Sequence, residues 1–206
     1  MKSLVLIGID TTDAKKMLGK LADDNQSMKK ALKKAVKETA EQARERLATQ
    51  AQKSYTVKDA GFKKDMRIRM ISGSQPAAII QTEGEPLPLR AFKTSKAGKV
   101  TRAQVVKAGS LKPLERGGIK AFINNIADKK QVRKKNTKKG KAGSRVRHIA
   151  VAQRKGKERL EINEKFSNSI PVMIGSRKHV YGLIEPYIAE DLQRNLRKFV
   201  ERALGG

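Results

Sequence analysis

A long run of apolar residues at helical spacing restricts the fold of this chain more than any other feature. Between Ser27 and Gln52, small and apolar side chains recur every three or four residues, which places them on one face of a helix. The positions on this face are Met28, Ala31, Leu32, Ala35, Val36, Thr39, Ala40, Ala43 and Leu47. At about 1.5 Å per residue this helix is about 40 Å long. Because many of these positions are Ala, another element can approach the helix closely.

The opposite face of this helix begins with lysines. They are Lys29, Lys30, Lys33, Lys34 and Lys37. Cations in a first turn oppose the helix dipole. Two interpretations follow: the helix is continuous from about residue 13, which we favour, or the basic face meets an anionic partner.

Several shorter patterns indicate β-structure. Residues 4–9 are apolar throughout and predict a strand. Residues 66–72 alternate apolar and basic side chains, residues 73–76 form a turn and residues 77–82 are apolar again, so a β-hairpin is expected over 66–82. Further strands are expected over 148–153 and 159–162, and 169–174 is expected to be extended.

The C-terminal part of the chain predicts a second amphipathic helix. Pro186 suits its first turn, and acidic residues precede basic ones along it, as the helix dipole favours. Its apolar face comprises Ile188, Leu192, Leu196, Phe199, Val200 and Ala203. The expected fold is one α+β domain over residues 1–206, with a long N-terminal amphipathic helix, a small antiparallel β-sheet region with a basic loop insertion, and a C-terminal amphipathic helix.

Charge points to an anionic partner. Lys and Arg number 47 against 20 Asp and Glu, a net charge of +27. Such an excess predicts contact with nucleic acid, an acidic protein surface or anionic lipid, and nucleic acid is the commonest of these. The alternative is that the charge serves solubility alone.

The charge is concentrated at residues 127–147. This segment has seven Lys and three Arg against one Asp, and its only large apolar residues are two Val. It cannot bury itself, so we expect a flexible insertion that orders on a polyanion or partner, with a solvated insert as the alternative. The candidate contacts with nucleic acid or an acidic partner are Lys129, Lys130, Arg133, Lys134, Lys135, Lys138, Lys139, Lys141, Arg145 and Arg147.

No pattern predicts catalysis, a metal site or a cofactor. The chain has no Cys, and its two histidines, His148 and His179, lack ligand spacing. No stretch reaches the roughly 18 apolar residues of a membrane span, and residues 1–9 resemble a signal peptide only faintly, so we expect a protein made and used inside a cell. The few aromatic residues form no cluster for base stacking, so any nucleic-acid contact is expected to be with phosphates.

The order of these segments resembles that of the prophage minor tail protein Z family, tail-completion proteins of long-tailed bacteriophages. The likeness covers about two thirds of the chain as short matches, while the insertion at 127–147 departs from the family pattern. The matching segments are the Ala-rich helix at 28–47, the region 57–71, GIKAFINN at 118–125, HIAVAQR at 148–154, GKERLEI at 156–162, SIPVM at 169–173 and the closing basic helix.

The resemblance implies a non-enzymatic virion protein in the tail or neck, made in the bacterial host cytoplasm. Such a subunit forms a homo-oligomeric ring that contacts tail-terminator, tail-tube or connector proteins, and possible further contacts are the tape-measure protein and packaged DNA. Candidate positions for the contact between subunits are Ala31, Ala35, Val36, Ala40, Ala43, Leu192, Leu196 and Phe199. The alternative is a sequence-nonspecific nucleic-acid-binding protein associated with ribosomes or the nucleoid, and a hydrolase or nuclease is least favoured.

Overall fold

Helices and short antiparallel sheets make up the described part of the chain, which confirms the α+β class. The structure is a computed structural model that describes residues 2–11, 26–58, 61–72, 75–97, 100–132, 145–156 and 161–204, with the backbone alone for 97, 125–132 and 145–148. The favoured continuation of the long helix back to about residue 13 falls on residues 12–25, which lie outside this description. The chain divides into two compact units: unit 1 comprises 1–55, 60–86 and 168–206, and unit 2 comprises 56–59 and 87–167.

Unit 1 contains a three-stranded antiparallel sheet. Its strands are β1 (Ser3–Asp10), β2 (Met66–Ile71) and β3 (Ala77–Gly84), in the order β1-β3-β2. This confirms the predicted strand near the N-terminus and the predicted hairpin. Ile80 at the centre of β3 pairs with Ile7 on β1 and Ile68 on β2, so these three side chains share one face of the sheet.

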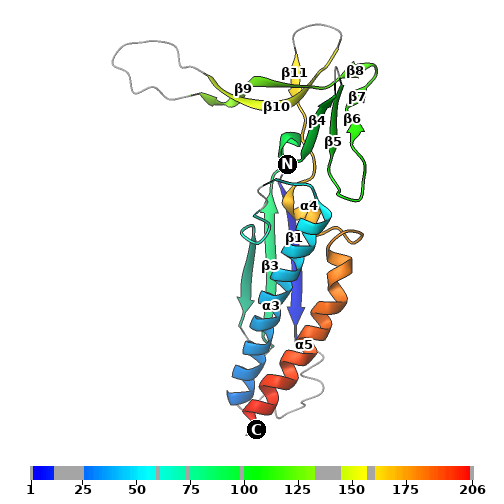
Figure 1. Ribbon diagram of the computed structural model, residues 1–206. Helices are drawn as coiled ribbons and strands as arrows, with labels where there is room; N and C mark the ends of the chain where they lie inside the picture. The colour runs from blue at the N-terminus through cyan, green and yellow to red at the C-terminus, as the bar shows by residue number, and fades with distance from the viewer. Residues whose placement is uncertain are drawn as a thin grey trace, which may run out of the picture. The chain divides into compact units, whose positions relative to one another are not determined.

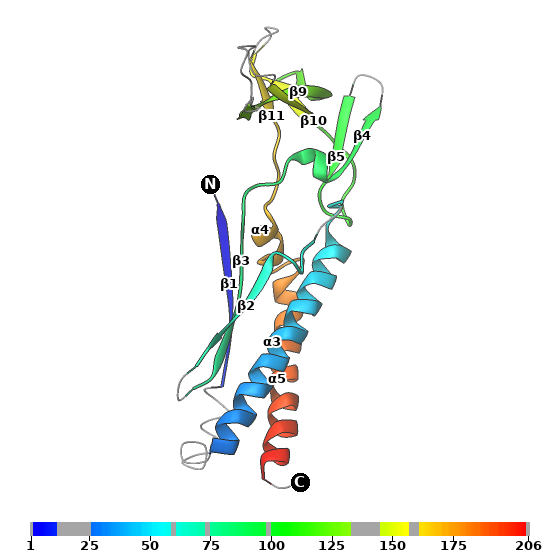
Figure 2. The same cartoon turned by 90° about the vertical axis from the view of Figure 1, so that its left-hand side faces the viewer.

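Three helices lie on the same side of this sheet (Figures 1 and 2). They are α3 (Gln26–Ser54), α4 (Ile170–Ile174) and α5 (Tyr181–Ala203). The long helices α3 and α5 lie side by side, and Figure 2 shows the strands on one side of them (Figures 1 and 2). Met28 and Leu32 on α3 are buried against Leu196 and Val200 on α5. This packing removes the apolar faces of both helices from water, which is the main source of their stability.

Polar side chains join the two helices further along. Asn195, which is 2% exposed, donates hydrogen bonds from Nδ2 to Thr39 Oγ1 at 2.9 Å and to Gln42 Oε1 at 3.1 Å. Arg46 Nε donates to the buried carboxylate of Asp191 at 2.9 Å. A buried polar group is tolerated only when it is hydrogen-bonded, so these bonds favour one register of α5 on α3.

Two predictions for the C-terminal region are wrong. α5 begins at Tyr181 and includes Pro186, although Pro186 was expected in its first turn. The earlier start follows from Val180 and Ile184, which are buried and anchor the first turn, while Pro186 removes a single backbone donor. Residues 170–174, expected to be extended, form the short helix α4, in which Pro171 occupies a first-turn position that proline favours.

Unit 2 is built of short antiparallel strands and one 3-10 turn. The strands form sheets in the orders β4-β5-β6, β7-β8 and β11-β10-β9. The elements are η1 (Leu89–Ala91), β4 (Lys93–Ala97), β5 (Val100–Gln104), β6 (Lys112–Pro113), β7 (Glu115–Arg116), β8 (Ile119–Lys120), β9 (Phe122–Val132), β10 (Arg145–Arg154) and β11 (Ile162–Glu164). The predicted strand at 148–153 is confirmed within β10. Its partner in the structure is β11, which shares only Ile162 with the partner expected at 159–162; Glu161 lies outside the strand, and residues 157–160 lie outside the described residues.

The basic insertion contains more regular structure than the sequence predicted. Residues 127–132 belong to β9 and residues 145–147 to β10, where a loop was expected. These strands pair antiparallel, from Ala152 opposite Phe122 to Arg145 opposite Val132, with an irregularity between Arg145 and Arg147. Backbone pairing needs no apolar side chain, which is why a lack of apolar residues misled the prediction. Residues 133–144 lie outside the described residues.

Candidate assembly and polyanion interfaces

The outer face of the unit 1 sheet, opposite α3, carries several exposed aliphatic side chains among polar ones. Because residues alternate between faces, Leu4 and Leu6 on β1 point away from the helices and are each 56% exposed. On β2, Ile71 occupies the same face and is 44% exposed. A sheet with one solvated face ordinarily places polar residues there. We call Leu4, Leu6 and Ile71, with the half-buried Ile79 on β3, the outer sheet patch.

Basic residues border the outer sheet patch. Arg67 and Arg69 alternate with Met66 and Ile68 along β2, so the arginines lie on the outer face, and both are exposed. Arg69 is paired in register with Ile79. Gln81 and Glu83 on β3 lie on the same face, opposite Leu6 and Leu4. The face therefore combines exposed aliphatic side chains with charges of both signs.

The predicted subunit-interface positions lie mostly inside unit 1. All five positions on α3 are at most 5% exposed, and Leu192, Leu196 and Phe199 on α5 are half-buried. The α3 positions are Ala31, Ala35, Val36, Ala40 and Ala43. The α3 positions make their apolar contacts within the chain.

The hairpin formed by β9 and β10 divides into a base and an arm. In the base, Ala150, Val151 and Ala152 are buried and β10 also pairs with β11. The arm, residues 125–132 with 145–148, has pairs only between its own two strands among the described residues, and both strands extend past the rest of unit 2 (Figure 1). An uncovered two-stranded ribbon is marginally stable in water.

The predicted polyanion contacts divide between this arm and residues that the structure does not describe. Lys129 and Lys130 lie on β9, and Arg145 and Arg147 lie on β10. The remaining six lie outside the described residues: Arg133, Lys134, Lys135, Lys138, Lys139 and Lys141. The backbone places the four described positions on one ribbon.

One hollow on unit 1, of about 510 Å³, is lined by residues of α3 and by residues 61–64. Its one acidic residue is Glu45, which forms an ion pair with Lys63. Within the described ranges, no three His, Asp or Glu side chains gather where they could hold a metal ion.

The two histidines have different positions. His179 lies half-buried before α5, where its ring meets that of Tyr55 edge to face at 6.1 Å between centroids. Its carbonyl oxygen accepts hydrogen bonds from Ser54 Oγ at 2.8 Å and Gln50 Nε2 at 3.1 Å. The backbone of His148 lies in β10. His179 thus has a packing role at the end of α3.

Sequence reasoning did not identify the outer sheet patch. Residues 4–9 are apolar at every position, so alternation could not show which side chains face the helices. The alternating hairpin strand at 66–71 was the available signal, because its basic residues mark the outer face.

Among the described residues, no helix is both long and apolar enough to cross a membrane. Comparison with protein-family models, curated proteins and solved structures found no match.

Proposed function

We propose that this protein is a structural virion subunit that acts in tail completion or head–tail joining at the head-proximal end of a long-tailed bacteriophage tail, or of a prophage-derived particle. It acts as a member of a homo-oligomeric ring and performs no catalysis. The resemblance to the minor tail protein Z family supports the location. The observation that carries the proposal is the outer sheet patch, because aliphatic side chains that are about half exposed gain stability when another subunit covers them.

The sheet has the two different edges that a ring requires. β1 and β2 are the edge strands, and each is antiparallel to β3, so they are parallel to each other. If β2 of one subunit pairs with β1 of the next, corresponding strands of successive subunits run in the same direction. Each subunit then uses two different surfaces for its two contacts. Such head-to-tail contacts close into rings when the rotation permits.

The long helix α3 has a supporting role in this proposal. α3 packs with α4 on the inner face of the sheet, α5 packs on α3, and the outer sheet patch is left for assembly. The β9–β10 arm supplies a second attachment, because a ribbon that is marginal alone is stabilised when it lies on a neighbouring subunit or on packaged DNA. Tail-terminator, tail-tube or connector proteins are the partners expected beside the ring.

The oligomeric state of the full chain tests assembly. We expect mass photometry to show a discrete species of several subunits, with rings in negative-stain electron microscopy. The double variant Leu4→Lys and Leu6→Lys should shift this species to monomer, because each added charge must be desolvated in the contact. The matched control is Leu183→Lys on α5 with Leu204→Lys directly after its C-terminal end, where the leucines are 48% and 67% exposed; it should leave the oligomer intact.

A chain that stays monomeric over the accessible concentration range would contradict the proposal, and so would an equal effect of the two double variants. The location is tested in the host particle. Deleting the gene should leave heads and tails unjoined, and the subunit should occur in particles at a small fixed copy number. Copurification with ribosomes without virion association would instead favour a free nucleic-acid-binding protein.

A further inference from the structure

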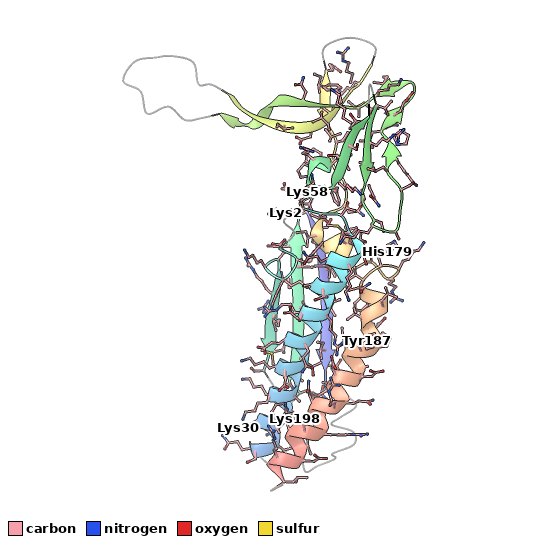
Figure 3. All side chains as sticks on the ribbon, viewed as in Figure 1. Lys2, Lys30, Lys58, His179, Tyr187 and Lys198 are labelled. Atoms are coloured by element: carbon pink, nitrogen blue, oxygen red, sulfur yellow. The ribbon has the colours of Figure 1, made fainter. Side chains whose placement is uncertain are left out.

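The solvent face at the start of α3 carries a compact group of lysines. The N-terminal lysine face comprises Lys29, Lys30, Lys33, Lys34 and Lys37, all of them exposed. Figure 3 shows Lys30 projecting from α3 into solvent. Lys29, Lys33 and Lys37 succeed one another at intervals of four, as do Lys30 and Lys34, so they form two adjacent rows. At about 1.5 Å per residue the rows cover about 12 Å of the helix.

Nothing within the described part of unit 1 neutralises this face. α3 has no acidic residue before Glu38, and Glu38 is bonded to Lys198 on α5 at 2.8 Å. The ion pairs of the described residues involve other cations: Arg46, Lys63, Lys155, Arg194 and Lys198. Like charges four residues apart on a helix repel each other and destabilise it. The rows therefore weaken the isolated helix, and an anionic ligand would relieve that repulsion.

The composition of the face distinguishes between two kinds of anionic partner. α3 contributes no exposed large apolar side chain, whereas the centres of protein–protein interfaces are enriched in aromatic residues and depleted in Lys. Lys acts as a flexible point charge that suits phosphate oxygens. Duplex DNA carries one charge per about 1.7 Å of its axis with both strands counted, so a stretch as long as the rows, about 12 Å, carries about seven phosphate charges.

We infer that the N-terminal lysine face of α3 binds the phosphate backbone of duplex nucleic acid without reading its sequence. The face shares no residue with the outer sheet patch or with the basic segment at 127–147. The inference goes beyond the proposed assembly role and does not depend on it.

Salt dependence of binding to a random-sequence DNA duplex tests the inference. Fluorescence anisotropy between about 50 and about 200 mM salt gives the slope of log K against log salt, whose magnitude falls by about 0.9 for each phosphate that the protein no longer neutralises. The variant that replaces all five lysines of the face by Gln should flatten the slope by up to about 4.5. A control variant removes the same charge from exposed lysines elsewhere, as Lys53→Gln, Lys93→Gln, Lys112→Gln, Lys120→Gln and Lys178→Gln.

The inference requires a clearly larger slope change in the face variant than in the control. Equal changes would show that net charge alone drives binding and would overturn it, as would tighter binding of polyglutamate than of DNA at equal charge. Circular dichroism checks folding, and a second variant with Arg at all five positions should retain the slope. Mass photometry of the same samples separates this result from assembly, because the face variant should keep the oligomeric state.

Discussion

The α3–α5 contact offers a direct test of the packing, through the buried amide of Asn195. Replacing Asn195 by Ala removes two hydrogen bonds, to Thr39 and to Gln42. Each such bond contributes about 1 kcal/mol net, and the small void left behind costs about 1 kcal/mol more. Thr39 Oγ1 still donates to the Ala35 carbonyl at 2.9 Å, so it remains satisfied as a donor. We expect Asn195→Ala to lower the free energy of unfolding by about 3 kcal/mol.

A double-mutant cycle separates the Asn195–Thr39 bond from the void. Thr39→Val removes the acceptor and retains the shape of the side chain. Combined with Asn195→Ala, it should show a coupling of about 1 kcal/mol. Far-ultraviolet circular dichroism during urea unfolding reports unit 1, because the α-helices among the described residues all lie there. Additivity within about 0.3 kcal/mol, or a decrease below about 1 kcal/mol for Asn195→Ala, would refute this account of the contact.

Three further outcomes follow from local geometry and charge. Gly182→Ala should destabilise unit 1 by about 2 kcal/mol, although Ala favours helices, because its Cβ would lie 2.3 Å from the Arg177 carbonyl oxygen; a rise in thermal stability would contradict this. Burial, and then the hydrogen bond to Glu185, raise the pKa of Tyr181 above its ordinary 10.0. Unit 1 should therefore lose stability as the pH rises above that value. In an ultraviolet titration, with the Tyr181→Phe variant as a blank, Glu185→Gln should lower the titration midpoint of Tyr181. The last variant replaces four lysines of the basic segment by Ala: Lys134, Lys135, Lys138 and Lys139. It should reduce the slope of log K against log salt for DNA binding by up to about 3.6. An unchanged slope would leave the segment a role as a protein contact or a linker.

Local patterns predicted much of unit 1 because short-range physics controls them. The alternation over 66–71 and the turn residues after it were enough to predict the hairpin of β2 and β3. The order of charges and apolar positions near the C-terminus predicted a helix there. Its start was missed because proline is unfavourable beyond the first turn of a helix, and the residues that anchor the observed start, Val180 and Ile184, are buried by tertiary packing.

The sequence could not show which apolar surfaces are covered within the chain and which are exposed. A stripe of Ala on α3 shows that something covers it but not whether the cover comes from the same chain. In the structure the cover is intramolecular: α5 and the sheet bury the α3 positions expected between subunits. The apolar residues of β1 could not be divided into inner and outer faces until their pairing with β3 was known.

The sequence alone established the hydrophobic periodicity of the helices and strands, because backbone preference depends on a residue and its near neighbours. It also established the large positive charge and the concentration of that charge at 127–147, because charge follows directly from composition. Long-range pairing assigned Ile7 to the core and Leu6 to the surface, though they are adjacent and both apolar. It did so because the pleat turns successive side chains to opposite sides, and the helices pack on one side alone.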